Sequence, residues 1–85
     1  MRHEDIREFQ RRQPFVPYRI TLTDGRTYDV LHPELAMVGY SSMLLGQRRA
    51  DEMDVVYDRF VTVSIAHVMQ IEELTAAQKP NNGSA

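Results

Sequence analysis

The stretch "PYRITLTDGRTYDVLHPE", residues 17–34, decides the fold, because it reads as two short strands joined by a tight turn. Tyr18, Ile20 and Leu22 alternate with polar residues, which is typical of a strand with one buried face. Beyond the turn the alternation resumes at Tyr28. The stretch therefore predicts an antiparallel hairpin.

The turn of this hairpin allows two registers. A two-residue turn would pair Ile20 with Asp29 and separate the apolar faces of the two strands. A three-residue loop, residues 23–25, pairs Ile20 with Tyr28 and keeps those faces together, so we prefer it. Gly25 then takes the left-handed position of a bulged turn, which glycine enters without steric cost.

A short helix is expected before the hairpin, over about residues 3–12. Ile6 and Phe9 lie on one face, acidic residues occupy the first half and two arginines the end, an arrangement that complements the helix dipole. Pro14 ends the helix, since the residue before a proline avoids the helical region.

Four further apolar segments follow the hairpin and are expected to form strands. Pro33 separates the first of them from the hairpin, because proline cannot donate a ladder hydrogen bond. Alternation places Val61, Val63 and Ile65 on one face of their strand, and Met69 and Ile71 are expected to point inward. The segments are residues 35–40, 43–47, 59–65 and 66–74.

One helix and five or six short antiparallel strands predict a mainly β (α+β) fold, in the form of a small closed or partly open barrel. Closure would remove exposed strand edges in a domain too small to cover them otherwise. Residues 1–75 are expected to form this single domain. The small polar residues of 76–85 predict a disordered tail.

The "TDGR" turn and the final "FVTVSIAHVMQI" give the chain a resemblance to the Sm-like family over about residues 4–74. This resemblance implies an SH3-like/Sm-like barrel with a very short connection at residues 64–67. Of the family's nucleotide-binding motifs only His67 matches, since the loop "LHPELAMVGYSS" carries no asparagine. The segment "RQPFVPYRITLTDGR" with "HPE" also resembles a group of small bacterial proteins of unknown function, and that likeness implies no activity.

Composition limits the function further. The 85 residues carry a net charge of −2, which argues against a dedicated nucleic-acid binder. The absence of cysteine excludes disulfides, thiolate zinc sites and a cysteine nucleophile. No apolar run approaches the roughly 20 residues that span a bilayer, and the start "MRHEDIREFQRRQ" has no apolar signal region. We therefore expect a cytoplasmic protein without a membrane partner.

The sequence contains no residue pattern that is specific to enzymatic catalysis, so we predict no catalytic residue and no cofactor. His32 and Glu34 would form a metal site only together with His67 or His3, and a solvated turn is the preferred interpretation. His67 would stack on a base or act as a general base. The preferred reading is a turn histidine whose ring bonds to nearby groups.

Two groups of residues remain as candidate contact sites. The first is a set of cationic side chains able to meet nucleic acid, although acidic residues adjoin two of them; it consists of Arg26, Arg48, Arg49 and His67. The second is an adaptable apolar patch for a protein partner, consisting of Met37, Tyr40, Met43 and Met53. Strand 43–47 or 59–63 could also pair with another chain.

The sequence thus favours a non-catalytic protein-interaction or self-assembling module, whose partner is a protein or a second copy of the chain. The alternative is a divergent Sm-like RNA-binding protein.

Overall fold

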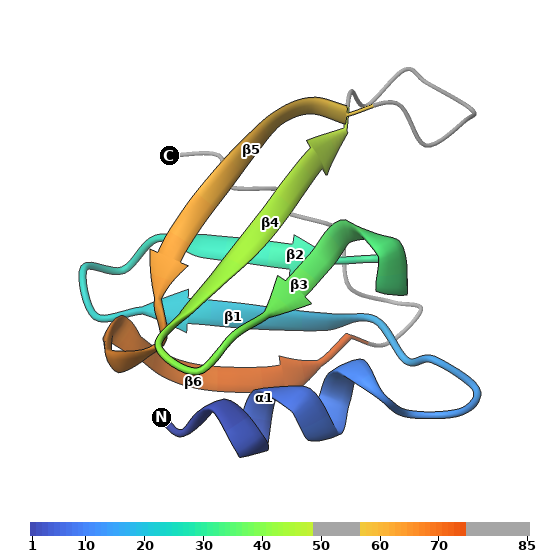
Figure 1. Ribbon diagram of the computed structural model, residues 1–85, viewed down its shortest axis with the longest axis horizontal. Helices are drawn as coiled ribbons and strands as arrows, with labels where there is room; N and C mark the ends of the chain where they lie inside the picture. The colour runs from blue at the N-terminus through green and yellow to red at the C-terminus, as the bar shows by residue number, and fades with distance from the viewer. Residues whose placement is uncertain (49–56, 75–85) are drawn as a thin grey trace.

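The computed structural model describes residues 1–48 and 57–74, with side chains omitted at 48, 57 and 58, and shows an α+β fold (Figure 1). One helix accompanies two three-stranded antiparallel sheets, with strand orders β2-β1-β6 and β3-β4-β5. The elements are α1 (His3–Gln10), β1 (Tyr18–Leu22), β2 (Thr27–Val30), η1 (Pro33–Leu35), β3 (Ala36–Val38), β4 (Ser42–Arg48), β5 (Tyr57–Ser64), η2 (Ile65–His67) and β6 (Val68–Glu73), where η denotes a 3₁₀ helix.

The hairpin register expected from the sequence is confirmed. Ile20 pairs with Tyr28, and the backbone N–H of Leu22 donates to the carbonyl of Arg26 at 2.8 Å. Gly25 has a φ of 90° at the tip, where a β-carbon would be strained. The bulged three-residue turn is therefore the one that keeps the apolar faces together.

The second sheet is built from the hairpin of β3 and β4, extended by β5. The N–H of Gly39 donates to the carbonyl of Ser42 at 2.9 Å and closes the turn between β3 and β4. Val63 and Ile65 are buried, and Val61 packs against the core from a half-buried position. The shared face expected for these residues is confirmed, and it is the inner face of the sheet.

β6 corrects one expectation about side-chain direction. Met69 was expected to point inward, but it is 59% exposed. The pairing of β1 with β6 shifts register at this point, from Leu22 with Val68 to Thr21 with Gln70, so Met69 is the extra residue of a bulge. The bulge lets Val68 and Ile71 both face the core, which strict alternation would forbid.

The helix is held to the sheets by an apolar face. Ile6 is fully buried, and the ring of Phe9 lies against that of Tyr18 with centroids 5.7 Å apart. The guanidinium of Arg12 covers the Phe9 ring at 4.2 Å and pairs with the carboxylate of Glu73. The face expected from the spacing of Ile6 and Phe9 is the buried one.

Gln10 adds a polar junction between the helix and both sheets. The buried hydroxyl of Tyr18 donates to its side-chain oxygen at 2.7 Å. The Gln10 amide nitrogen donates to the carbonyls of Pro33 at 2.5 Å and Ala36 at 3.2 Å. Burial raises the pKa of Tyr18 far above that of a free tyrosine, so its hydroxyl remains a donor at every physiological pH.

The expectation of an SH3-like/Sm-like barrel is wrong. The strands form two separate sheets rather than one closed ladder. At one corner β2 gives way to η1, where Pro33 has no N–H to continue a ladder. At the other corner η2 takes the chain from one sheet to the other: Ile65 still bonds to Ser41, and the carbonyl of His67 already accepts from Thr23. The core lies between the sheets and is closed by α1 (Figure 1).

Candidate interaction surface

An apolar patch lies on the outer face of the β3-β4-β5 sheet. Met37 pairs with Leu44 across β3 and β4, and Phe60 pairs with Gly46 across β4 and β5. These positions have the opposite parity to the core residues of the same strands, so their side chains face outward. We call Met37, Leu44 and Phe60 the outer-face patch.

Two members of this patch are strongly exposed. Met37 is 70% exposed and Phe60 57%, whereas Leu44 is half-buried. Gly46 presents no side chain beside Phe60, and a hollow of about 90 Å³ opens there; Met37, Leu44 and Phe60 line it together with Glu34 of η1. The patch therefore combines a flexible thioether, an aromatic ring and a small recess.

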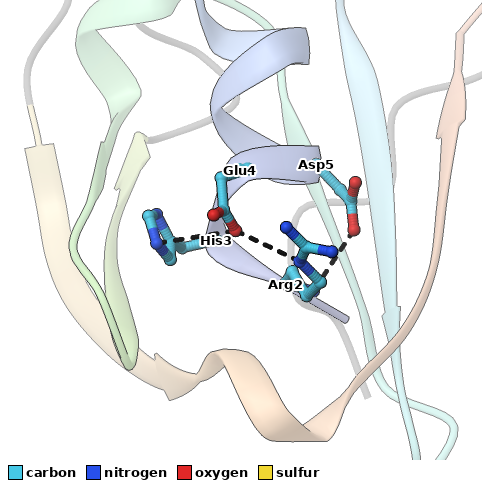
Figure 2. Close-up of polar contacts among 4 residues, drawn as sticks. All are labelled: Arg2, His3, Glu4 and Asp5. Carbon is cyan, nitrogen blue, oxygen red and sulfur yellow. Dashed lines mark hydrogen bonds and ion pairs between the residues drawn. The ribbon is translucent and has the colours of Figure 1, made fainter.

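Tyr40 lies outside this patch, at the turn between β3 and β4. Its ring is 84% exposed and meets the imidazole of His3 edge to face, with centroids 4.7 Å apart. Figure 2 shows the polar contacts that surround His3: Glu4 accepts from the Arg2 side chain at 3.4 Å and lies 3.5 Å from His3 Nε2. Asp5 accepts from the Arg2 backbone N–H at 3.3 Å. The hydrogen bond from Arg2 lowers the pKa of the Glu4 carboxyl.

This polar cluster stabilises the start of α1 and is not a binding site. Carboxylates in the first turn complement the positive end of the helix dipole, which is sufficient reason for Glu4 and Asp5 to stand there. His3 Nδ1 is buried without a hydrogen-bond partner in the described part of the chain. The ring contact with His3 holds Tyr40 beside the N-terminus of α1.

A second surface feature is a groove of about 340 Å³ at the tip of the β1–β2 hairpin. The hairpin supplies Thr23 and Arg26, β5 supplies Thr62 and Ser64, and η2 supplies His67. The structure therefore brings together two of the residues predicted to contact nucleic acid, Arg26 and His67. His67 Nδ1 lies 3.5 Å from the Thr23 hydroxyl, in keeping with a turn histidine.

The charge of Arg26 is already matched inside the groove. Its Nε donates to Asp24 at 2.8 Å and its backbone N–H donates to the same carboxylate at 3.0 Å. These bonds, the backbone one first, lower the pKa of the Asp24 carboxyl, which keeps the carboxylate ionised. The groove consequently offers a neutral ion pair rather than an uncompensated cation.

The other basic side chain of the hairpin is also paired. Arg19 donates through Nε and Nη2 to the two carboxylate oxygens of Asp29 at 2.7 and 3.2 Å. This fork is the strong bidentate form of the arginine–carboxylate contact, and it raises the pKa of Arg19. The Asp29 side chain is fully buried beneath it.

The remaining predicted contact residues are dispersed. Met43, which we expected in the apolar patch, is 1% exposed and belongs to the core, because its pairing with Val38 and Val63 sets it on the inner face. Arg48 ends β4, and its side chain lies outside the described residues. Arg49 and Met53 also lie outside them, as does the tail 76–85.

The structure does not bring His32, Glu34 and His67 together as a metal site. Within residues 1–48 and 57–74 no group of three or more His, Cys, Asp or Glu side chains could hold a metal ion. His67 lies at the hairpin tip where β2 begins, whereas His32 and Glu34 follow the end of β2. The four residues of β2 span on the order of 13 Å.

Within residues 1–48 and 57–74, no helix has the length and apolarity required to cross a membrane.

Phe60 is the patch residue that sequence reasoning missed. The signal was present, because the same alternation that turned Val61 and Val63 inward turns Phe60 outward. A large aromatic at an outward strand position adds apolar area to the outer face of the sheet. Comparison of the chain with protein-family models, curated proteins and solved structures gave no match.

Proposed function

We propose that this chain is a non-catalytic protein-interaction module of the cytoplasm, and that its contact surface is the outer-face patch. The observation that supports this proposal is the exposure of Met37 and Phe60 beside a recess on an otherwise regular sheet. Methionine and aromatic side chains are enriched where proteins meet, since they bury much apolar area and adapt in shape.

The size of the recess argues for the class of partner. Its volume of about 90 Å³ exceeds the roughly 30 Å³ of one water molecule. It is well below the roughly 300 Å³ at which small-molecule sites begin. A recess of this size suits one apolar side chain presented by a protein segment. The proposed partner is therefore a polypeptide that anchors itself by a single apolar residue.

Polynucleotide binding has weaker support. The two arginines of the hairpin are both engaged by carboxylates, Arg26 by Asp24 and Arg19 by Asp29. Binding to phosphates gains from cationic side chains that displace the counterions condensed on the nucleic acid, and a guanidinium already paired with a carboxylate contributes less. RNA binding is therefore an alternative that the experiment below tests.

A peptide-display selection against the full chain tests the proposal directly. Peptides that bind should share an apolar anchor, and calorimetry should show affinity reduced at least tenfold by Phe60→Ser or Met37→Ser. Thr21→Ser, a change on the first sheet away from the patch, is the matched control and should leave the affinity unchanged.

Two outcomes would overturn the proposal. One is selected peptides that bind Phe60→Ser as tightly as the original chain. The other is a short mixed-sequence RNA that binds at low salt and dissociates as salt rises, with no peptide selected. That second result would favour the RNA-binding alternative.

A further inference from the structure

β5 is an edge strand that lacks the usual protection against pairing with another strand. The strand order β3-β4-β5 leaves one side of β5 without a described neighbour, and the strand runs for eight residues. Exposed edges are usually short or protected by proline, lysine or a covering loop. The stretch Phe60–Ser64 contains no proline and no charged residue.

The backbone groups that face this edge can be identified from the ladder. The N–H of Ile65 donates to the carbonyl of Ser41 at 2.9 Å, and the register continues regularly through Val63 with Met43. Antiparallel ladders alternate between bonded and non-bonded pairs. Val63 therefore bonds to β4, and the N–H and C=O of Thr62 and Ser64 point to the open edge.

The sequence along the edge is complementary to itself. Val61, Thr62 and Val63 read the same in both directions. If two copies of β5 pair antiparallel about Thr62, Val61 lies opposite the partner's Val63 on the inner side. Phe60 lies opposite the small side chain of the partner's Ser64 on the outer side. The two valines then face each other, the two Thr62 hydroxyls meet at the centre, and no like-charge pair arises.

A groove lies beside the open edge of β5. The groove of about 340 Å³ runs between Thr62, Val63 and Ser64 on one side and the hairpin tip on the other. No strand within residues 1–48 and 57–74 fills it.

We propose that β5 is a homodimerisation edge, at which two copies of the chain pair antiparallel around a two-fold axis through Thr62. The result is a continuous six-stranded sheet of order β3-β4-β5 followed by the partner's β5-β4-β3. A self-complementary contact of this kind is the usual basis of a closed dimer. The inference goes beyond the proposed function, because it uses the edge of the sheet rather than its face.

A single cysteine tests the register. The chain has no cysteine of its own, so Thr62→Cys introduces one unambiguous reporter. Bonded antiparallel pairs hold their α-carbons about 5.5 Å apart, which lies within the range of disulfides. Mild oxidation should convert most of the Thr62→Cys chain to a covalent dimer. Thr21→Cys, at a half-buried position of the other sheet, and Met37→Cys, at an exposed position, should stay reduced.

A proline at the same position tests the hydrogen bonds. Thr62→Pro removes an N–H that points to the edge and leaves the ladder with β4 intact, so the variant should fold but lose the dimer. Light scattering should give twice the 9.9 kDa chain mass for the original protein and for Thr62→Val, and a single chain mass for Thr62→Pro. If Thr62→Pro does not fold, the oxidation experiment decides alone.

The outcomes separate this inference from the proposed function. A monomer at millimolar concentration, with no cross-link at position 62, would overturn the edge pairing even if selected peptides still bind the outer-face patch. A dimer that cross-links through Met37→Cys and not through Thr62→Cys would also overturn it. A dimer cross-linked at position 62 supports it, whether or not peptides bind the patch.

Discussion

Replacement of Gln10 by alanine tests how the helix is joined to the sheets. The substitution removes the acceptor of the Tyr18 hydroxyl and the donor to the carbonyls of Pro33 and Ala36. The bond to Pro33 is exposed, so water can replace it. The Tyr18 hydroxyl belongs to a residue with no exposed surface and is left unsatisfied.

The magnitude follows from this difference. A buried polar group without a partner costs about 1–3 kcal/mol, so Gln10→Ala should lower the free energy of unfolding by about 2 kcal/mol. For a domain of this size the midpoint of thermal unfolding should fall by about 8–16 °C. Urea unfolding followed by circular dichroism measures the free energy, and the dependence on urea should not change. Glu8→Ala, an exposed change in the same helix, should cost less than about 0.5 kcal/mol.

A double-mutant cycle decides whether the reasoning is right. In a Tyr18→Phe background there is no hydroxyl to leave unsatisfied, so Gln10→Ala should cost at least about 1 kcal/mol less than in the original chain. A coupling energy within about 0.5 kcal/mol of zero would refute the account. The Gln10–Tyr18 hydrogen bond would then make no measurable contribution to stability.

Three further predictions concern the hairpin and the two sheet faces. Because hydrogen bonds from Arg26 lower the pKa of Asp24 in the folded chain, the stability they supply is present above the unfolded pKa of about 3.9 and is lost as the pH falls through the folded pKa. Thermal unfolding of Asp24→Asn should therefore depend less on pH below about pH 4, and equal pH profiles would contradict this. Gly25→Ala places a β-carbon at positive φ and should lower the free energy of unfolding in urea by about 1–2 kcal/mol. An unchanged urea midpoint would contradict this prediction. Met43→Ala should cost about 2–5 kcal/mol by opening a core cavity, while Met37→Ala should stay within about 0.5 kcal/mol, and comparable losses would show that the two faces are misassigned.

Local chemistry made the hairpin predictable, while the arrangement of the sheets depended on distant pairings. The register about Ile20 and Tyr28 follows from alternation and from the need for glycine at the tip. Closure into a barrel does not follow from such patterns, because it requires ladder bonds across both corners, and η1 and η2 interrupt them.

The candidate surface was predictable in part. Grouping methionines by type placed Met37 and Met43 together, although the pairing of Val38 with Met43 sets them on opposite faces. That pairing depends on the turn at Gly39, whose N–H bonds to Ser42. The bulge at Met69 could not be predicted from the alternation of residues, because it is defined by the pairing of β6 with β1.

The separation of the two sheets has a consequence for motion. In the part of the chain described, β2-β1-β6 and β3-β4-β5 share side-chain packing and the two 3₁₀ corners but no ladder. We therefore expect each sheet to open as a cooperative unit smaller than the whole fold, because its strands keep their own partners when the other sheet opens. Amide hydrogen exchange would reveal this as two sets of protection factors, one for each sheet. The 3₁₀ corners, exchanging faster than either set, would be the hinges about which the protein opens.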